Sequence, residues 1–233
     1  MNNAERFLEI YNEVDRFLTD FSSGKYESYS DKIRNSTKPI IKRYHDQLLD
    51  YGDLRNAIVH RPKKDDNYIA NPLDKVVKDF EYILEKLKNP PRVFSKFCFK
   101  VEGVKQNEKL DSALKIMCAK SFSQMPIFDD EGEKVVEILN TNTISRWLGR
   151  NIKNNEIVEE NPTISELFQD IEFRKNYKFI SKECDTYTAY HYFTEQIKKH
   201  SRNLDVLLIT NNGKENEPLL GLITVADIAK LSP

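Results

Sequence analysis

Residues 55–60, Arg-Asn-Ala-Ile-Val-His, bring three side chains that can act on RNA into one short segment. On a helix, Asn56 and His60 are neighbours at i and i+4 while Arg55 lies on the adjoining row, so their polar ends can meet. The His60 imidazole can transfer a proton near neutral pH, and the Arg55 guanidinium can hold a phosphate through two hydrogen bonds. Asn56 could orient either group. The motif therefore suits metal-independent RNA cleavage by the ribose 2′-hydroxyl, which leaves a 2′,3′-cyclic phosphate.

A second motif, Gly-Leu-Ile-Thr-Val-Ala-Asp at residues 221–227, combines features that bind phosphate and ribose. A strand is predicted to end at Ile223, so Thr224 lies near a helix N-terminus, where free backbone N–H groups favour phosphate. Asp227 follows on the same helical edge, where its carboxylate can accept hydrogen bonds from both ribose hydroxyls. The alternative interpretation is a plain helix-capping pair, with Thr224 as the N-cap and Asp227 as the third helical residue.

The first 91 residues are predicted to form an all-α domain. Apolar residues at spacings of three and four predict three helices, over residues 3–21, 35–60 and 73–87. Gly52 is expected to loosen the middle helix, and Ile58 and Val59 are expected to face the core. The segment 89–91, Asn-Pro-Pro, ends the third helix and marks the predicted domain boundary.

Residues 92–233 are predicted to hold two repeats of a β-α-β-β-α unit, in which Gly132 aligns with Gly213. The first repeat, about residues 92–150, has predicted elements at 97–101, 110–120, 125–128, 135–139 and 144–148. The second repeat, about residues 163–233, has predicted elements at 179–180, 186–199, 206–209, 219–223 and 225–231, after a lead-in helix at 163–168. The predicted fold class is therefore α+β, with an all-α bundle followed by a tandem β-α-β-β-α pair.

These repeats resemble a tandem pair of CBS domains (a Bateman module) over residues 92–233. The segment 221–227 is similar to the family's pattern of glycine, two hydrophobic residues, threonine or serine, two further residues and aspartate. The resemblance implies that Thr224 and Asp227 bind the phosphate and ribose of an adenine nucleotide, and that Ile180 faces the base. The equivalent segment of the first repeat, residues 137–143, lacks the glycine and the aspartate, so one nucleotide site per chain is expected.

The N-terminal domain resembles the HEPN superfamily over about residues 1–90. Its ribonuclease members carry an arginine, four to six residues and a histidine late in a helix, often with a polar residue after the arginine, as Asn56 is here. The resemblance implies that Arg55, Asn56 and His60 are catalytic and that two such motifs meet across a homodimer. The basic residues expected to contact the RNA backbone are Arg61, Lys63 and Lys64. The alternative is a capping or surface histidine in an inactive, dimerising bundle.

Composition limits the setting in which either activity would operate. Apolar residues make up 39% and charged residues 31% of the chain, and the formal net charge is −1, which disfavours constitutive tight binding to long nucleic acid. Residues 1–6 have no signal-peptide character, and no stretch approaches the ~20 apolar residues of a membrane span. Three widely spaced cysteines, Cys98, Cys118 and Cys184, predict buried thiols in a reducing cytoplasm, with neither disulfides nor a metal site.

The leading hypothesis is a cytoplasmic homodimer in which a CBS pair senses an adenine nucleotide and regulates a ribonuclease that cuts single-stranded RNA without a cofactor. Such a layout suits a stress or anti-phage effector; an antitoxin or another partner protein is a possible partner, and the sequence does not say whether one exists. The rival hypothesis is a non-catalytic, nucleotide-sensing regulatory protein whose helical domain dimerises or binds a partner.

Overall fold

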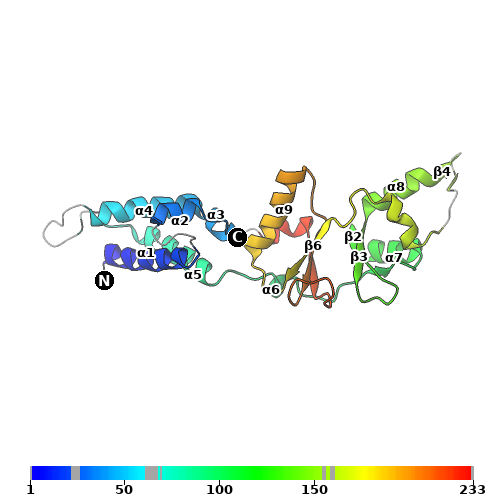
Figure 1. Cartoon of the computed structure of the whole chain (residues 1–233), viewed down its shortest axis with the longest axis horizontal. Helices are drawn as coiled ribbons and strands as arrows, with labels where there is room; N and C mark the ends of the chain where they lie inside the picture. Colours follow the sequence, from blue (N-terminus) through cyan, green and yellow to red (C-terminus); the bar gives the residue numbers. More distant parts are fainter. Residues whose placement is uncertain are drawn as a thin grey trace. The chain divides into compact units, whose positions relative to one another are not determined.

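The computed structural model describes residues 2–21, 27–60, 68, 70–153, 156–157 and 161–231. The chain divides into two compact units. The helical unit comprises Met1–Pro91 together with Asp185–His191, and the repeat unit comprises Arg92–Cys184 with Tyr192–Pro233. The predicted α+β fold class is confirmed (Figure 1). Within the described ranges, no helix has the length and apolar character needed to cross a membrane.

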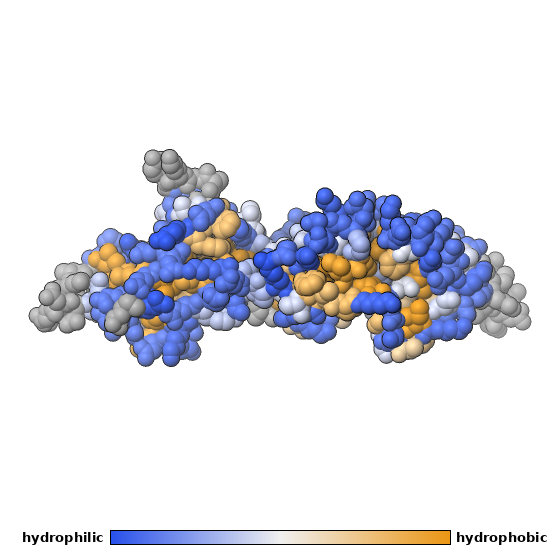
Figure 2. All heavy atoms as spheres, turned by 90° about the horizontal axis from the view of Figure 1, so that it is seen from below, coloured by the Kyte–Doolittle hydropathy of each residue, from blue (hydrophilic) through white to orange (hydrophobic). Residues whose placement is uncertain are grey.

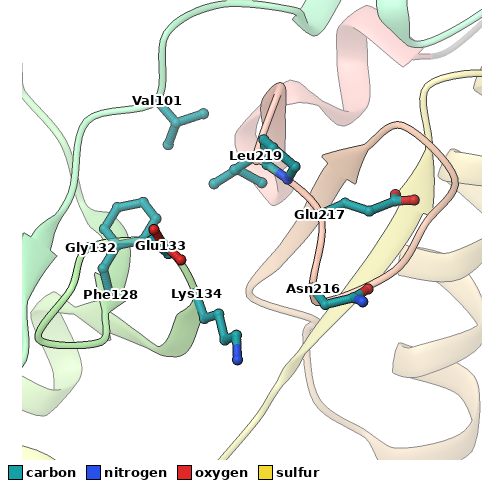
Figure 3. A pocket seen from close by; sticks show the side chains of 9 residues that line it. Val101, Phe128, Gly132, Glu133, Lys134, Asn216, Glu217 and Leu219 are labelled. Carbon is teal, nitrogen blue, oxygen red and sulfur yellow. The ribbon is translucent and has the colours of Figure 1, made fainter.

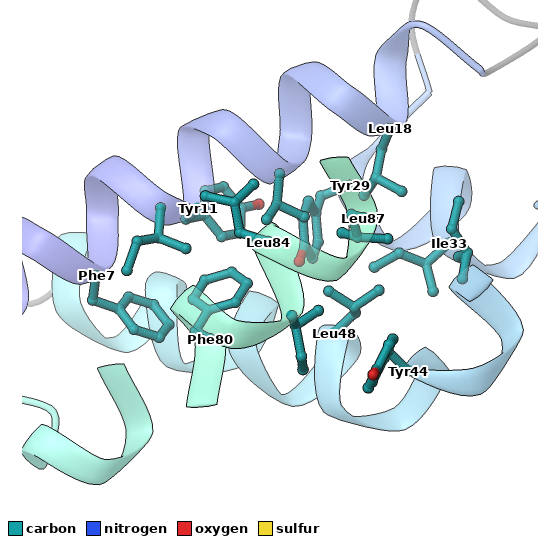
Figure 4. Close-up of a cluster of buried hydrophobic side chains, with 14 of the residues drawn as sticks. Phe7, Tyr11, Leu18, Tyr29, Ile33, Tyr44, Leu48, Phe80, Leu84 and Leu87 are labelled. Carbon is teal, nitrogen blue, oxygen red and sulfur yellow. The ribbon is translucent and has the colours of Figure 1, made fainter. Parts of the chain in front are cut away.

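The helical unit is built from α1 (Asn3–Thr19), α2 (Tyr29–Arg34), α3 (Pro39–Arg43), α4 (His45–Val59) and α5 (Asp74–Lys88). The predicted first and third helices are confirmed as α1 and α5. A capping box starts α1, because the Asn2 side chain accepts from the Glu5 N–H group and the Glu5 carboxylate accepts from the Asn2 N–H group. Phe7, Leu48 and Phe80 are fully buried where α1, α4 and α5 meet (Figure 4).

The middle of the helical unit differs from the single helix predicted over residues 35–60. The chain leaves helical geometry at Tyr44, with φ −103° and ψ 16°, so two helices form where one was expected. Gly52 does not loosen α4; it is buried within it, and a Cβ atom there would lie 3.1 Å from the ring of Tyr29. The short helix α2, which carries Tyr29, was not predicted because a six-residue helix contains too few turns to show a periodic pattern.

The repeat unit contains two three-stranded sheets with the same topology. The first repeat has α6 (Phe94–Phe97), β1 (Val104–Lys105), α7 (Leu110–Lys120), β2 (Gln124–Phe128), β3 (Val135–Asn140) and α8 (Thr141–Asn151), followed by the short strands β4 (Ile152–Lys153) and β5 (Glu156–Ile157). The second has η1 (Ile164–Asp170), β6 (Tyr177–Ser181), α9 (Thr186–His200), β7 (Val206–Thr210), β8 (Gly221–Thr224), η2 (Val225–Asp227) and α10 (Ile228–Leu231). In each sheet the first strand is parallel to the second and the second is antiparallel to the third (Figure 1).

The strand predicted over residues 97–101 is wrong. Phe97 ends α6, Cys98 forms an isolated bridge with Gly221, and the Phe99 N–H group donates to the Leu220 carbonyl at 3.1 Å. The alternating aromatic residues therefore mark a segment of the first repeat that crosses β8 of the second. A side chain at Gly221 would collide with the Phe97 carbonyl oxygen, which explains the glycine.

The segment before the second repeat packs on the first repeat. The expected lead-in helix is present as the 3₁₀ helix η1, and its Ile164 and Leu167 side chains are fully buried with Trp147. The Leu110 N–H group donates to the Pro162 carbonyl, and the Ile164 N–H group donates to the Glu108 carbonyl, each at 2.9 Å. The segment at the start of the first repeat thus packs on the second repeat, and the segment at the start of the second packs on the first. These two sets of contacts hold the pair together.

The predicted burial of the cysteines is wrong for two of the three. Cys98 and Cys118 are exposed, Cys184 is intermediate, and no disulfide joins any two of them. Exposure arises because Cys98 lies on the crossing segment and Cys118 follows the buried Met117 around α7. Over the described part of the chain, no three His, Cys, Asp or Glu side chains gather as a metal site.

Replacing Gly221 by alanine should destabilise the protein by about 2 kcal/mol or more, because the new methyl group collides with backbone that cannot rotate away. Gly149 on the exposed face of α8 is the matched control, since a Cβ there meets no atom within 4 Å. Gly149→Ala should raise stability by about 0.5–1 kcal/mol through helix propensity. Urea unfolding of both variants decides the point, and equal stability of Gly221→Ala and the wild type would contradict the close crossing.

Candidate functional site

A cavity of about 430 Å³ lies between the two repeats, within the repeat unit. It is lined by residues 99–102 and 120–124 of the first repeat and by Leu222, Thr224, Ala226, Asp227 and Lys230 of the second. The crossing at Gly221 positions the first of these segments beside the start of η2. The structure therefore brings Thr224 and Asp227 together in the wall of this Thr224 cavity.

Thr224 donates two hydrogen bonds to Asp227 at the start of η2. The Thr224 N–H group and hydroxyl donate to Asp227 Oδ2 at 3.1 and 2.9 Å, and Lys230 Nζ donates to Asp227 Oδ1 at 2.7 Å. Burial opposes the negative charge, but the hydrogen bonds from Lys230 and Thr224 outweigh it and lower the pKa of Asp227 below its ordinary value. The capping interpretation thus describes the local geometry, and it leaves a charged carboxylate in the cavity wall.

The other lining residues supply positive charge and aromatic surface. Lys100, Lys120 and Lys230 line the cavity, and Lys120 Nζ lies 3.3 Å from Glu102 Oε1. Phe99 is 48% exposed and Phe122 is 38% exposed, so each adds aromatic surface to the cavity wall. Elsewhere the surface seen in Figure 2 is mainly hydrophilic, with apolar side chains exposed in narrower strips. This arrangement can hold an anion, a diol and an aromatic base together.

Ile180, the residue expected to face the base, is not brought to the Thr224 cavity. It lies in the middle of β6, where it pairs with Ile209 and is 4% exposed. The segments 99–102 and 120–124 form the cavity wall opposite Thr224 and Asp227. The motif at residues 221–227 did not reveal them because they belong to the other repeat. Ser121 and Ser201 occupy the same place after the first helix of each repeat, and both adopt positive φ, 55° and 52°. In the sequence, the matching serines are the signal that relates this part of the first repeat to the second.

The equivalent cleft of the first repeat is occupied by polar side chains. Asn140 replaces Thr224, and its Oδ1 accepts from the N–H group of Thr143 at 2.9 Å. Asp205 lies in the connection between α9 and β7, and its N–H group donates to the Asn176 carbonyl at 2.9 Å. Burial raises the pKa of Asp205 to about 6, the Glu137 charge raises it further, and the side-chain amides of Asn176 and Asn140 and Arg202 oppose the rise.

A second cavity of about 490 Å³ lies between the hairpin loops of the two repeats (Figure 3). Glu133 and Lys134 line it from the first hairpin, and Asn216 and Glu217 line it from the second. The Asn212 N–H group and side-chain amide donate to Glu217 at 2.6 Å, which lowers the pKa of Glu217 to about 2. That carboxylate is committed to its own loop, so the lining of this cavity offers less to a ligand than the Thr224 cavity does.

The Arg-x4-His motif lies at the exposed end of α4. Arg55 Nη1 donates to Asn56 Oδ1 at 3.3 Å, and the Arg55 guanidinium lies 5.4 Å from the ring centroid of Tyr11. His60 is the exposed C-cap residue, and its N–H group donates to the Asn56 carbonyl at 3.0 Å. The structure thus brings Arg55 and Asn56 into contact and places His60 one turn beyond them.

Two apolar residues within this motif were predicted to face the core, and only one of them does. Ile58 is fully buried, whereas Val59 is 43% exposed because it lies about 100° further around the last turn of α4. The proposed RNA contacts Arg61, Lys63 and Lys64 lie outside the described residues.

Comparison with known proteins gives matches at the level of structure. No protein-family model and no curated protein matches this chain. A signal-transduction protein with CBS domains from Burkholderia ambifaria is 17% identical, with 56% of this chain and 81% of that chain covered and a TM-score of 0.40. CBSX2 in complex with AMP is 13% identical, with 60% and 94% covered and a TM-score of 0.43. The CBS domain pair of MJ0100, in complex with 5′-methylthioadenosine and S-adenosyl-L-methionine, is 17% identical, with 61% and 95% covered and a TM-score of 0.42. Because these values are low, we derive function from the geometry of the chain itself.

The raised pKa of Asp205 should make the stability of the protein depend on pH. A carboxyl whose folded pKa of about 6 exceeds its unfolded value of about 3.9 contributes stability at low pH that is lost as pH rises through about 6. Asp205→Asn removes this titration. The variant should therefore gain about 1 kcal/mol on the wild type between pH 4 and pH 7.5, a value discounted for partial exposure. Urea unfolding at both pH values measures it, and a difference that does not change with pH would contradict it.

Proposed function

We propose that residues 92–233 form a CBS pair that binds an adenine nucleotide in the Thr224 cavity, and that the protein is a nucleotide-sensing regulator. One observation carries the proposal: the charged Asp227 and the hydroxyl of Thr224 lie in the wall of a cavity that both repeats line. A cleft between two structural units with a few convergent polar groups is the usual form of a small-molecule site.

The chemistry of the cavity supports a ribonucleotide as the ligand. Its phosphate would be held by Thr224 and by the lysines that line the cavity, among them Lys120 and Lys230. The two ribose hydroxyls would donate to Asp227, whose carboxylate can accept more hydrogen bonds than it receives from Thr224 and Lys230. Phe99 and Phe122 would stack on the base, because aromatic rings bind any planar base face.

Binding at this place would regulate through the contact between the repeats. The ligand would touch residues 99–102, which belong to the segment that crosses Gly221, and Asp227, which ends η2 directly before the last helix of the second repeat. It would therefore stabilise one arrangement of the crossing segment over others. Residues 99–102 follow the predicted boundary at 89–91, so a change there would act on the chain that leads from the helical domain.

Asp227→Asn should weaken AMP binding by about tenfold or more, since a hydrogen bond to a charged group contributes about 1.5–3 kcal/mol. Calorimetric titration of the full chain with AMP measures the change. Asp111→Asn is the matched control, because Asp111 is also an acidic residue in the first turn of a helix of the repeat unit, but it pairs with Lys115 outside the cavity. Equal AMP affinity in Asp227→Asn and the wild type would contradict the proposed site.

The second candidate function is metal-independent cleavage of single-stranded RNA at the end of α4, regulated by the CBS pair. The contact between Arg55 and Asn56 and the exposed His60 favour it, because a phosphate-binding cation and a proton-transfer group lie within the last turns of α4. A homodimer would pair two such edges into one cleft. Without this activity, the helical domain would serve as a dimerising or partner-binding unit, which includes an antitoxin as partner.

His60→Ala should reduce the rate of RNA cleavage at least about 100-fold, because general acid–base catalysis typically contributes that much. The measurement uses end-labelled single-stranded RNA in EDTA, with and without AMP, and detects cyclic-phosphate ends. His45→Ala is the matched control, since His45 is an exposed histidine of the same helix that pairs with Asp46. Cleavage that survives His60→Ala, or that is absent from the wild type with and without AMP, would rule the activity out.

A further inference from the structure

The two repeats differ most at one equivalent position in their third strands. Gly221 stands three residues before Thr224, which β8 pairs with Val206 at the start of β7. Glu137 stands three residues before Asn140, which β3 pairs with Gln124 at the start of β2. The strand registers therefore superpose Glu137 on Gly221 and Asn140 on Thr224. In the second repeat this position touches crossing backbone, whereas in the first it carries a carboxylate.

Glu137 uses its carboxylate to hold the segment that crosses the first repeat. It is only 1% exposed, and it accepts hydrogen bonds from Arg174 Nε at 2.8 Å and from the Lys175 N–H group at 3.0 Å. Counting back from the paired strands β1 and β6 superposes Arg174 on Cys98, the residue that bridges Gly221. In the first repeat, the hydrogen bonds of the Glu137 side chain hold the crossing segment on the third strand. In the second repeat, direct backbone contact at Gly221 holds it.

Asp205 occupies the place in the first repeat that opens as the cavity in the second. The same strand alignment superposes Asn176 on Lys100, and both Lys100 and Thr224 line the Thr224 cavity. The Asp205 N–H group donates to the Asn176 carbonyl at 2.9 Å, and the Asp205 carbonyl accepts from Gln124 Nε2 at 2.9 Å, which holds Asp205 between β2 and the segment that carries Asn176. The Asn176 side chain is held further by donating to the Asn203 carbonyl at 2.8 Å.

We infer that Glu137 and Asp205 close the first-repeat cleft and take the place of a ligand there, so that the pair accepts a phosphate-bearing ligand only in the Thr224 cavity. A phosphate entering the first-repeat cleft would have to displace satisfied hydrogen bonds and would meet the Asp205 carboxyl, with the charge of the buried Glu137 close behind it. The closed cleft also fixes residues 171–177 against β3. The conformation around the first-repeat cleft therefore stays the same, while the conformation around the Thr224 cavity responds to the ligand.

Hydrogen exchange of the full chain, followed by mass spectrometry, tests the closure without any ligand. In Glu137→Ala the amides of residues 171–177 should exchange about tenfold faster than in the wild type, because the buried acceptor of the Lys175 N–H group is lost. Glu137→Gln keeps one acceptor oxygen and should give a smaller increase, and it decides the test if Glu137→Ala does not fold. Glu133→Gln, at an exposed glutamate of the same repeat, is the control and should change nothing in this segment. Unchanged exchange of residues 171–177 in both Glu137 variants would overturn the inference.

Equilibrium dialysis with AMP tests the site count and rests on the proposed nucleotide binding. The wild type should bind one AMP per chain, and the double variant Thr224→Val with Asp227→Ala should bind none. Two AMP per wild-type chain, or one AMP in the double variant, would show that the first-repeat cleft is open and would overturn the inference. A wild type that binds no AMP would contradict the proposed function, while the exchange measurement would still decide whether the cleft is closed.

Discussion

The contact of Phe97 and Cys98 with Gly221 is the constraint on which the rest of the repeat unit depends. Backbone from the first repeat lies directly on β8, and a side chain at Gly221 would have no room. This contact places residues 99–102 beside Thr224 and Asp227, and the cavity between the repeats follows from that placement. The reverse exchange, in which η1 buries Ile164 and Leu167 against the first repeat, closes the pair from the other side. Two similar sheets thus become one unit through segments that each gives to the other.

The pair is symmetric in backbone and asymmetric in side chains, and the asymmetry is electrostatic. The Thr224 cavity has three lysines in its wall beside two carboxylates, Asp227 and Glu102, of which Glu102 pairs with Lys120, so it suits an anion with hydroxyl groups. The first-repeat cleft instead holds Glu137 and Asp205, which are satisfied by neighbouring amides and by Arg174. A scaffold with two equivalent positions therefore offers a ligand one of them, and the other serves as internal structure.

Local patterns in the sequence predicted most of the fold, and non-local packing decided what they missed. The helices α1, α5 and α7 follow from apolar periodicity, and Thr224 and Asp227 follow from a spacing that the start of one helix requires. The strand expected at 97–101 failed because its aromatic alternation reflects a crossing over another repeat. Ile180 does not line the Thr224 cavity, because the cavity takes its second wall from the first repeat, and its expected contact with the base stays a prediction. The exposure of Val59 follows from its place about 100° beyond the buried Ile58 around the last turn of α4, so the two side chains do not share one face.

The central claim is that the cavity beside Gly221 is the nucleotide site of the chain. A crystal structure of the full chain grown with AMP tests it most directly. We expect one AMP per chain, with its ribose hydroxyls on Asp227, its phosphate near Thr224 and Lys120, and no ligand beside Glu137 or Asp205. AMP bound between Asn140 and Asn176, or outside the repeat unit altogether, would contradict it.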